Sequence, residues 1–167
     1  MLYTIIVNMK QIESYLLAFM VMIIVMFLPN GVMRKSIDSP WYECIKAPIT
    51  PPKFVFPIVW TILYITIGVG LAQSLLLRNS YEKTVLLGLY ALNLVLNVVW
   101  SFVFFGNHDI VMALFVLCML FISTAFILYY TYLLLPLWVF WMLLPYIAWL
   151  QFAWLLNFLS IFRKCKK

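Results

Sequence analysis

Charged residues are scarce in this chain. Of its 167 residues only 10% are charged, with 11 Lys and Arg against 5 Asp and Glu, while 67% are apolar. Soluble globular domains carry about 25% charged and about 45–50% apolar residues. So few charged side chains cannot cover the water-facing surface of a protein of this size. The composition therefore excludes a soluble fold and indicates an integral membrane protein in a lipid bilayer.

Groups that ligate metals or act as nucleophiles are also scarce. The chain has one histidine, His108, and three cysteines without metal-ligand spacing. Axial haem ligation by His108 stays open as an alternative, but a lone histidine in a four-residue turn is typical of a solvated loop residue. No phosphate-binding glycine loop and no nucleophile–base pair occur. The sequence thus gives no support to hydrolase or ATPase chemistry, predicts no metal site and indicates no required cofactor.

Long apolar runs are abundant. About 20 apolar residues are needed to cross the hydrocarbon layer, and five segments meet that length: 11–28, 54–77, 84–105, 110–134 and 137–162. The last two come from 53 residues without a formal charge. As one helix these would be about 80 Å long, so the chain must turn back, and Pro136 predicts where. We expect an all-α membrane protein, a bundle of five transmembrane helices in a single domain over residues 1–167.

The basic residues predict the orientation of the bundle. Five spans place three basic residues on the side of the N-terminus (Lys10, Arg78 and Lys83) and eight on the other side, in residues 29–53 and the C-terminal tail. Since cytoplasmic loops are enriched in Lys and Arg, residues 29–53, here called the first loop, and the C-terminus are predicted to be cytosolic. Short basic clusters between neutral runs are typical of membrane proteins, so no nucleic-acid partner is expected.

Polar side chains gather on one face of the third span. At 100° per residue they fall within a sector of about 100°; they are Tyr90, Asn93, Asn97, Trp100 and Ser101. Polar groups inside a membrane are costly unless they are paired or face a cavity. Two explanations remain open: the asparagines bridge neighbouring helices, each contributing about 0.6–2 kcal/mol, or they line a ligand site.

Aromatic residues lie deep in the second and fifth spans. Trp60 and Tyr64 share one face of the second span, and a stripe at spacings of three or four follows the fifth: Tyr146, Trp149, Ala153, Asn157 and Ser160. Indoles usually prefer the membrane interface, so deep ones suggest an aromatic pocket for a large flat apolar ligand, oriented by the amides of Asn93 and Asn97. Gly68, Gly70 and Gly88 are expected to permit close helix packing.

Three motifs in order carry a resemblance to a known family. They are Trp41-Tyr42, Lys46, Pro48, Thr50-Pro51-Pro52 and Phe56–Tyr64; then Asn93–Ser101 with Phe104-Phe105-Gly106; then Pro145–Ala153 with Leu156-Asn157. Together they resemble the signature of the translocator protein family (TspO/MBR), also called the tryptophan-rich sensory protein or peripheral-type benzodiazepine receptor family. The resemblance covers all five spans.

The resemblance implies a five-helix bundle, often a homodimer, with a pocket between the helices that the first loop covers as a lid. Members bind porphyrins and haem, isoquinoline- and benzodiazepine-type drugs and, in mitochondria, cholesterol. The family's pocket positions fall here on Trp60, Tyr64, Asn93, Asn97, Trp100, Ser101, Trp149, Phe152 and Ala153. The predicted ligand-binding set also contains Trp41, Tyr42 and Pro51 of the first loop and Tyr146 of the fifth span. In some bacterial relatives the indoles that match Trp60 and Trp149 are linked to light-dependent breakdown of protoporphyrin.

The chain departs from the family pattern at three places. Trp41 and Lys46 are five steps apart instead of six, with Ile49 where a tryptophan is expected. Phe158 replaces the tyrosine of the cholesterol motif, which argues against cholesterol and, with the short N-terminus, favours a bacterial membrane over the mitochondrial outer membrane. Trp100 replaces a phenylalanine-like side chain and is expected to narrow the cavity.

The function predicted from these residues is binding of porphyrin, haem and similar flat apolar molecules in a membrane, for tetrapyrrole transport or sensing. Two alternatives stay open. One is a light-dependent protoporphyrin-degrading enzyme that uses Trp60 and Trp149. The other is a structural membrane scaffold in which the asparagines only bridge helices.

Overall fold

The computed structural model describes residues 2–163, and for residues 2–7 the backbone only. Its elements are α1 (Leu2–Phe27), α2 (Asn30–Ile37), α3 (Pro40–Ile45), α4 (Val55–Leu76), α5 (Tyr81–Ser101), the π-helical turn η1 (Phe102–Gly106), α6 (Ile110–Leu134) and α7 (Leu137–Ile161). Within this part of the chain there are five helical stretches long and apolar enough to cross a membrane. The predicted fold class, an all-α bundle of five transmembrane helices, is confirmed.

The helices follow the local signals of the sequence. Pro136 separates α6, which ends at Leu134, from α7, which begins at Leu137, because proline cannot continue the hydrogen bonding of a helix interior. α5 begins at Tyr81, three residues before the predicted start of that span, because the Ser80 side chain accepts a hydrogen bond from the Lys83 backbone N–H at 3.1 Å.

The first span and the first loop differ from the prediction. α1 already begins at Leu2 rather than near residue 11. It ends at Phe27, as the Pro29-Asn30-Gly31 signal predicts, but a helix resumes at once as α2. The first loop then contains a second short helix, α3, whose N-terminus is capped by Ser39 and has Pro40 in its first turn. Much of this segment is therefore ordered helix rather than irregular loop.

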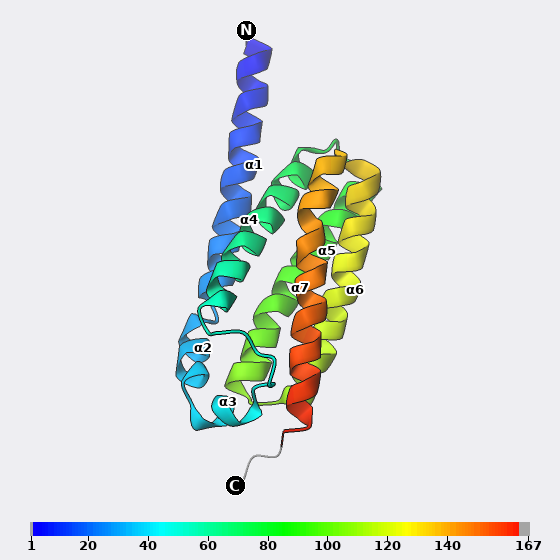
Figure 1. The fold of residues 1–167 in the computed structure, drawn as a ribbon. Helices are drawn as coiled ribbons and strands as arrows, with labels where there is room; N and C mark the ends of the chain where they lie inside the picture. Colours follow the sequence, from blue (N-terminus) through cyan, green and yellow to red (C-terminus); the bar gives the residue numbers. More distant parts are fainter. Residues whose placement is uncertain (1, 164–167) are drawn as a thin grey trace.

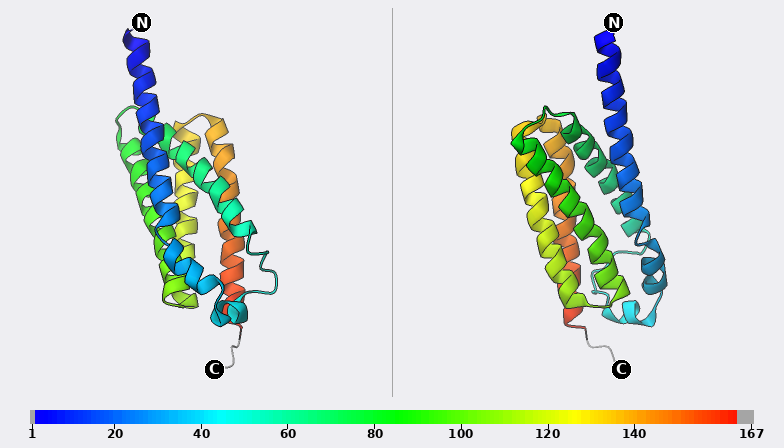
Figure 2. Two further views of the ribbon diagram at one scale, coloured as in Figure 1. Left: turned by 90° about the vertical axis from the view of Figure 1, so that its left-hand side faces the viewer. Right: turned by 180° about the vertical axis from the view of Figure 1, so that it is seen from behind.

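The long helices form one bundle (Figure 1). α1 packs along α4, and α5, α6 and α7 follow one another as antiparallel neighbours, with α4 also contacting α7 and α5. The N-terminal part of α1 extends beyond the other helices, while α2 and α3 lie at the opposite end, near the last turn of α7 (Figures 1 and 2). The first loop thus sits over one end of the bundle.

Two of the three glycines singled out above permit close packing. A Cβ at Gly68 would lie 3.1 Å from Met22 on α1, and one at Gly70 would lie 2.5 Å from the Tyr90 hydroxyl on α5. At Gly88 nothing lies within 4 Å. The packing prediction is therefore wrong for Gly88, because this face of α5 points away from the other helices.

Candidate ligand-binding site

A cavity lies among α4, α5, α6 and α7 at the end of the bundle that carries α2 and α3. Its lining is mostly aromatic and aliphatic and draws on every element except α1: Met33, Ile37, Tyr42, Lys46, Thr50, Phe56, Trp60, Asn97, Trp100, Phe104, Phe105, Leu117, Leu120, Trp149, Ala153, Leu156, Asn157 and Ser160. Concave, mostly apolar sites with a few polar groups are typical of small-molecule binding.

The aromatic wall of this cavity is built from ring pairs. Trp149 of α7 makes an edge contact with Phe56 of α4, with ring centroids 5.8 Å apart. Trp100 stacks on Phe104, with centroids 5.2 Å apart and planes at 18°. The π-helical turn places Phe104 and Phe105 one after the other on the cavity side. The indoles of α5 and α7, together with Trp60 of α4, thus surround one common space.

The cavity is narrow. The cavity volume enclosed between the lining side chains is about 70 Å³. Since one water needs roughly 10–15 Å³ of such space, the cavity suits a few waters. A flat molecule as large as a tetrapyrrole enters only if the first loop or the lining side chains move outward.

A buried hydrogen-bond network lies beside the cavity and joins four helices. The Tyr64 hydroxyl donates to Asn97 Oδ1 at 2.9 Å, and Asn97 Nδ2 donates to the Tyr146 hydroxyl at 3.3 Å. Tyr146 in turn donates to Asn93 Oδ1 at 2.8 Å. Asn93 Nδ2 continues to the hydroxyls of Ser123 and Thr124 on α6, at 2.7 and 2.9 Å. The network therefore connects α4, α5, α7 and α6.

The two asparagines of α5 thus have different positions. Asn93 is 1% exposed, lies outside the cavity lining and is bonded to α6 and α7, as helix bridging requires. Asn97 also takes part in the network, but it lines the cavity as well. Asn93 therefore fits the helix-bridging explanation, whereas Asn97 fits both helix bridging and the lining of a ligand site.

The two indole N–H groups of Trp100 and Trp149 differ in their hydrogen bonding. Trp100 Nε1 donates to Asn157 Oδ1 at 3.4 Å, and Asn157 Nδ2 donates to the Ile110 carbonyl at 2.8 Å. Trp149 Nε1 is buried and has no hydrogen-bond partner within the described residues. An indole N–H buried without a partner is costly.

Six of the thirteen predicted site residues line the cavity: Tyr42, Trp60, Asn97, Trp100, Trp149 and Ala153. The other seven lie around it. Tyr64, Asn93, Ser101 and Tyr146 are buried behind the lining. Phe152 packs against Trp149, Pro51 lines a second hollow that shares Tyr42, Lys46 and Thr50 with the cavity, and Trp41 packs on His108 and Phe104.

The prediction missed several lining residues. Phe56, Phe104 and Phe105 stand in the motifs quoted above, so a signal for them was present. Leu117 and Leu120 of α6 and Met33 and Ile37 of α2 gave none, because an aliphatic residue in an apolar helix reads alike whether it faces lipid, another helix or a cavity.

His108 is exposed but has contacts that the prediction of a solvated loop residue did not include. Its ring stacks on Trp41 with centroids 3.9 Å apart, and its Nε2 lies 3.3 Å from Ser36 Oγ. It has a positive φ of 56° in the turn between η1 and α6. His108 therefore joins this turn to α2 and α3. An axial ligand of a haem bound in the cavity would have to line the cavity, and His108 is not among the lining residues.

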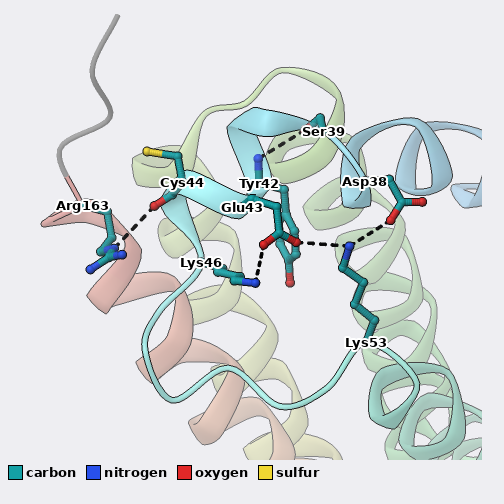
Figure 3. Close-up of polar contacts among 8 residues, drawn as sticks. All are labelled: Asp38, Ser39, Tyr42, Glu43, Cys44, Lys46, Lys53 and Arg163. Carbon is teal, nitrogen blue, oxygen red and sulfur yellow. Dashed lines mark hydrogen bonds and ion pairs between the residues drawn. The ribbon is translucent and has the colours of Figure 1, made fainter.

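Ion pairs hold the first loop together over the cavity mouth (Figure 3). Lys53 Nζ lies 2.9 Å from Asp38 Oδ1 and 3.2 Å from Glu43 Oε1, and Glu43 also pairs with Lys46. The hydrogen bonds from Lys46 and then Lys53 lower the pKa of Glu43. Hydrogen bonds to Asp38 and Glu43 raise the pKa of Lys53. Both charges are therefore favoured near neutral pH.

Tyr42 and Arg163 add to this mouth. Burial, and then the charge of Glu43, raises the pKa of the Tyr42 hydroxyl, so this group stays protonated near neutral pH. Arg163 Nε donates to the Cys44 carbonyl at 3.5 Å and joins the end of α7 to α3. Lys164, Lys166 and Lys167, which entered the orientation prediction, lie outside the described residues.

The fold and site define a class of protein: a multi-pass helical membrane protein with a narrow aromatic cavity at one end, covered by the segment between its first two spans. Within this class, the TspO/MBR family model matches residues 14–162. The chain belongs to this family.

Individual relatives support the membership of this family. The chain is 34% identical to Protein CrtK of Rhodobacter capsulatus over 77% of this chain and 81% of that one. It is 31% identical to the tryptophan-rich sensory protein of Cereibacter sphaeroides, covering 77% and 78% of the two chains. The translocator protein of Bos taurus is 35% identical over 71% of each chain.

Proposed function

We propose that the chain binds porphyrin, haem and similar large flat apolar molecules in this cavity and acts in tetrapyrrole transport or sensing. The observation that carries the proposal is the meeting of Trp60, Trp100 and Trp149, from three helices, on one apolar space. Indole faces suit flat conjugated rings by stacking. In this proposal the Trp149 N–H, which has no hydrogen-bond partner among the described residues, donates to the ligand and fixes its orientation.

Because the cavity is narrow, binding of a large ligand requires part of its lining, here the first loop, to move. Met33, Ile37, Tyr42 and Lys46 line the cavity from this segment, so its outward movement widens the space directly. In this proposal the first loop is a movable lid and faces the cytosol. Isoquinoline- and benzodiazepine-type drugs would compete for the same space, and a bacterial membrane and a homodimer are part of the same proposal.

The test is porphyrin binding by the purified protein in detergent, followed by the shift of the porphyrin absorbance band. Trp60→Ala and Trp149→Ala should each weaken binding by about tenfold or more, since loss of a large apolar contact costs about 1.5–3 kcal/mol. Trp138→Ala is the matched control, because Trp138 is 50% exposed and outside the cavity. Absence of saturable binding by the wild-type protein would overturn the proposal.

A pair of variants separates this proposal from a structural scaffold. Asn93→Leu removes a bridge between helices but leaves the cavity lining intact, so it should lower the melting temperature and leave porphyrin affinity within about twofold. Asn97→Leu changes both the network and the lining, so it should lower the melting temperature and the affinity together. If Asn97→Leu affects only the melting temperature, the scaffold explanation is favoured.

A second candidate function, light-dependent oxidation of bound porphyrin, is favoured by the position of Trp60 and Trp149 on the same cavity. Under illumination in the presence of dioxygen, Trp149→Phe should abolish product formation and spare binding. If porphyrin bleaches at the protein-free rate in the wild-type sample, this candidate fails.

A further inference from the structure

Lys46 connects the cavity with the space outside it. Together with Tyr42 and Thr50 it lines both the cavity and a second hollow, which Pro51, Pro52 and Lys53 complete. Within the described part of the chain, Lys46 is the one charged residue in the cavity lining. A molecule whose apolar body fills the cavity and whose edge reaches the mouth therefore meets a cation there.

The charged residues of the first loop differ in their number of ion-pair partners. Glu43 is shared by Lys46 and Lys53, while Lys53 also has Asp38 as a partner. If a different anion takes the place of Glu43 at Lys46, Glu43 keeps Lys53 and Lys53 keeps Asp38. The exchange thus leaves no carboxylate of the first loop unpaired.

The exchange also costs little. The side chains of Lys46 and Glu43 are 41% and 45% exposed, and ion pairs at that exposure contribute little to stability. Among the described residues drawn in Figure 3, Lys46, Lys53 and Arg163 are basic, whereas Asp38 and Glu43 are acidic. The mouth therefore keeps a positive charge that can receive an anion.

Hydroxyl groups supply further donors at the same place. Tyr42 and Thr50 line the two hollows together with Lys46, and a carboxylate accepts hydrogen bonds from both hydroxyl and ammonium groups. An ammonium group that lines the same two hollows as two hydroxyl-bearing side chains, beside an apolar space, is suited to a molecule with an apolar body and an ionised acidic edge.

We propose that this mouth is a carboxylate subsite, in which Lys46, with Tyr42 and Thr50, receives an acidic group of the ligand by exchange with Glu43. This inference rests on the proposed function and adds to it the chemical class of the ligand: a flat apolar ring system that carries a carboxylate at its edge. In this exchange the arriving acidic group takes the place of Glu43 at Lys46, so its arrival also loosens one ion pair of the first loop.

The test compares protoporphyrin, a dicarboxylic acid, with its dimethyl ester, which has the same ring but no ionised group. At low ionic strength the wild-type protein should bind the acid at least tenfold more tightly than the ester, and added salt should reduce this preference. Lys46→Gln should bring the two affinities within about twofold of each other, mainly by weakening acid binding. Unchanged ester affinity in this variant shows that the cavity is still folded.

Two further variants serve as controls. Lys46→Arg keeps the charge and should retain the preference for the acid. Lys35→Gln removes a charge from the exposed surface of α2, outside both hollows, and should also retain it. Equal binding of acid and ester by the wild-type protein, or a preference that survives Lys46→Gln, would overturn the carboxylate subsite alone. Failure of both porphyrins to bind would instead overturn the proposed function.

Discussion

At the scale of single residues, this protein places similar side chains in different roles within one helix. Asn93 and Asn97 are one turn apart on α5, yet only Asn97 reaches the cavity. Gly70 and Gly88 likewise differ. Gly70 makes room for the Tyr90 hydroxyl, whereas Gly88 has open space around it. In each pair the surroundings, and not the residue type, decide what a substitution does.

Gly70→Ala should therefore destabilise the bundle. Its Cβ would lie 2.5 Å from the hydroxyl of Tyr90, which is 1% exposed, and overpacking of this kind costs about 1–3 kcal/mol. The measurement is the melting temperature in detergent. Gly88→Ala is the control and should be neutral or stabilising, because alanine is about 0.5–1 kcal/mol better than glycine in a helix.

A double variant tests the cause. Tyr90→Phe removes the oxygen that the new methyl group meets, so it should recover part of the stability lost in Gly70→Ala. A Gly70→Ala protein as stable as Gly88→Ala would contradict the close packing of α4 on α5.

At the scale of elements, the first loop is a structured part of the site. α3 contacts η1 through aromatic pairs: the ring centroids of Trp41 and Phe104 are 5.7 Å apart, and those of Tyr42 and Phe105 are 5.9 Å apart. Ion pairs from Lys53 to Asp38 and Glu43 then join the end of the loop to α3 and its N-terminal flank. The position of α3 therefore depends on both apolar contact and charge.

The docking of α3 should weaken in acid. The folded-state pKa of Glu43 is lowered by Lys46 and Lys53, so its contribution is fully present above the ordinary pKa of a glutamate and is lost as the pH falls through the lowered value. Hydrogen exchange of the α3 amides, corrected for the intrinsic chemical rate, should accelerate in that acidic range.

Glu43→Gln is the control for this pH dependence. It lacks the titrating group, so its α3 amides should already exchange faster near neutral pH and change less on acidification. Identical exchange profiles for the wild-type and variant proteins would show that the ion pairs do not hold α3 in place.

At the scale of the whole molecule, the bundle needs a lipid environment and has two unlike ends. Large apolar side chains are exposed along its long helices, for example Ile24 at 61%, Phe115 at 60% and Trp141 at 60%. The cavity mouth opens at the end that carries the first loop, with its four basic residues Arg34, Lys35, Lys46 and Lys53. If the excess of basic residues sets the orientation, this mouth faces the cytosol.

Epitope tags test this orientation in a bacterial host. A tag inserted after Asn79, in the segment between α4 and α5, should be accessible to antibody from outside once the outer membrane is permeabilised. A tag attached to the C-terminus should become accessible only after the inner membrane is permeabilised. The reverse pattern would place the first loop and the cavity mouth on the outer side.

The sequence by itself determined the class of fold and part of the site. The length of its apolar runs and the break at Pro136 are local signals, because they depend on hydrophobicity and backbone geometry within a few residues. The aromatic and amide positions of the second, third and fifth spans were also readable, since such side chains are rare and costly inside a membrane.

Only the tertiary structure decided which of those side chains bridge helices and which line the cavity. It assigned Asn93 to α6 and α7, brought Leu117 and Leu120 into the lining, and joined Lys46 to Glu43 at the mouth. These outcomes depend on the rotation and distance of neighbouring helices. In an apolar span the faces toward lipid, helix and cavity have nearly the same composition, so the order of residues along the chain cannot tell them apart.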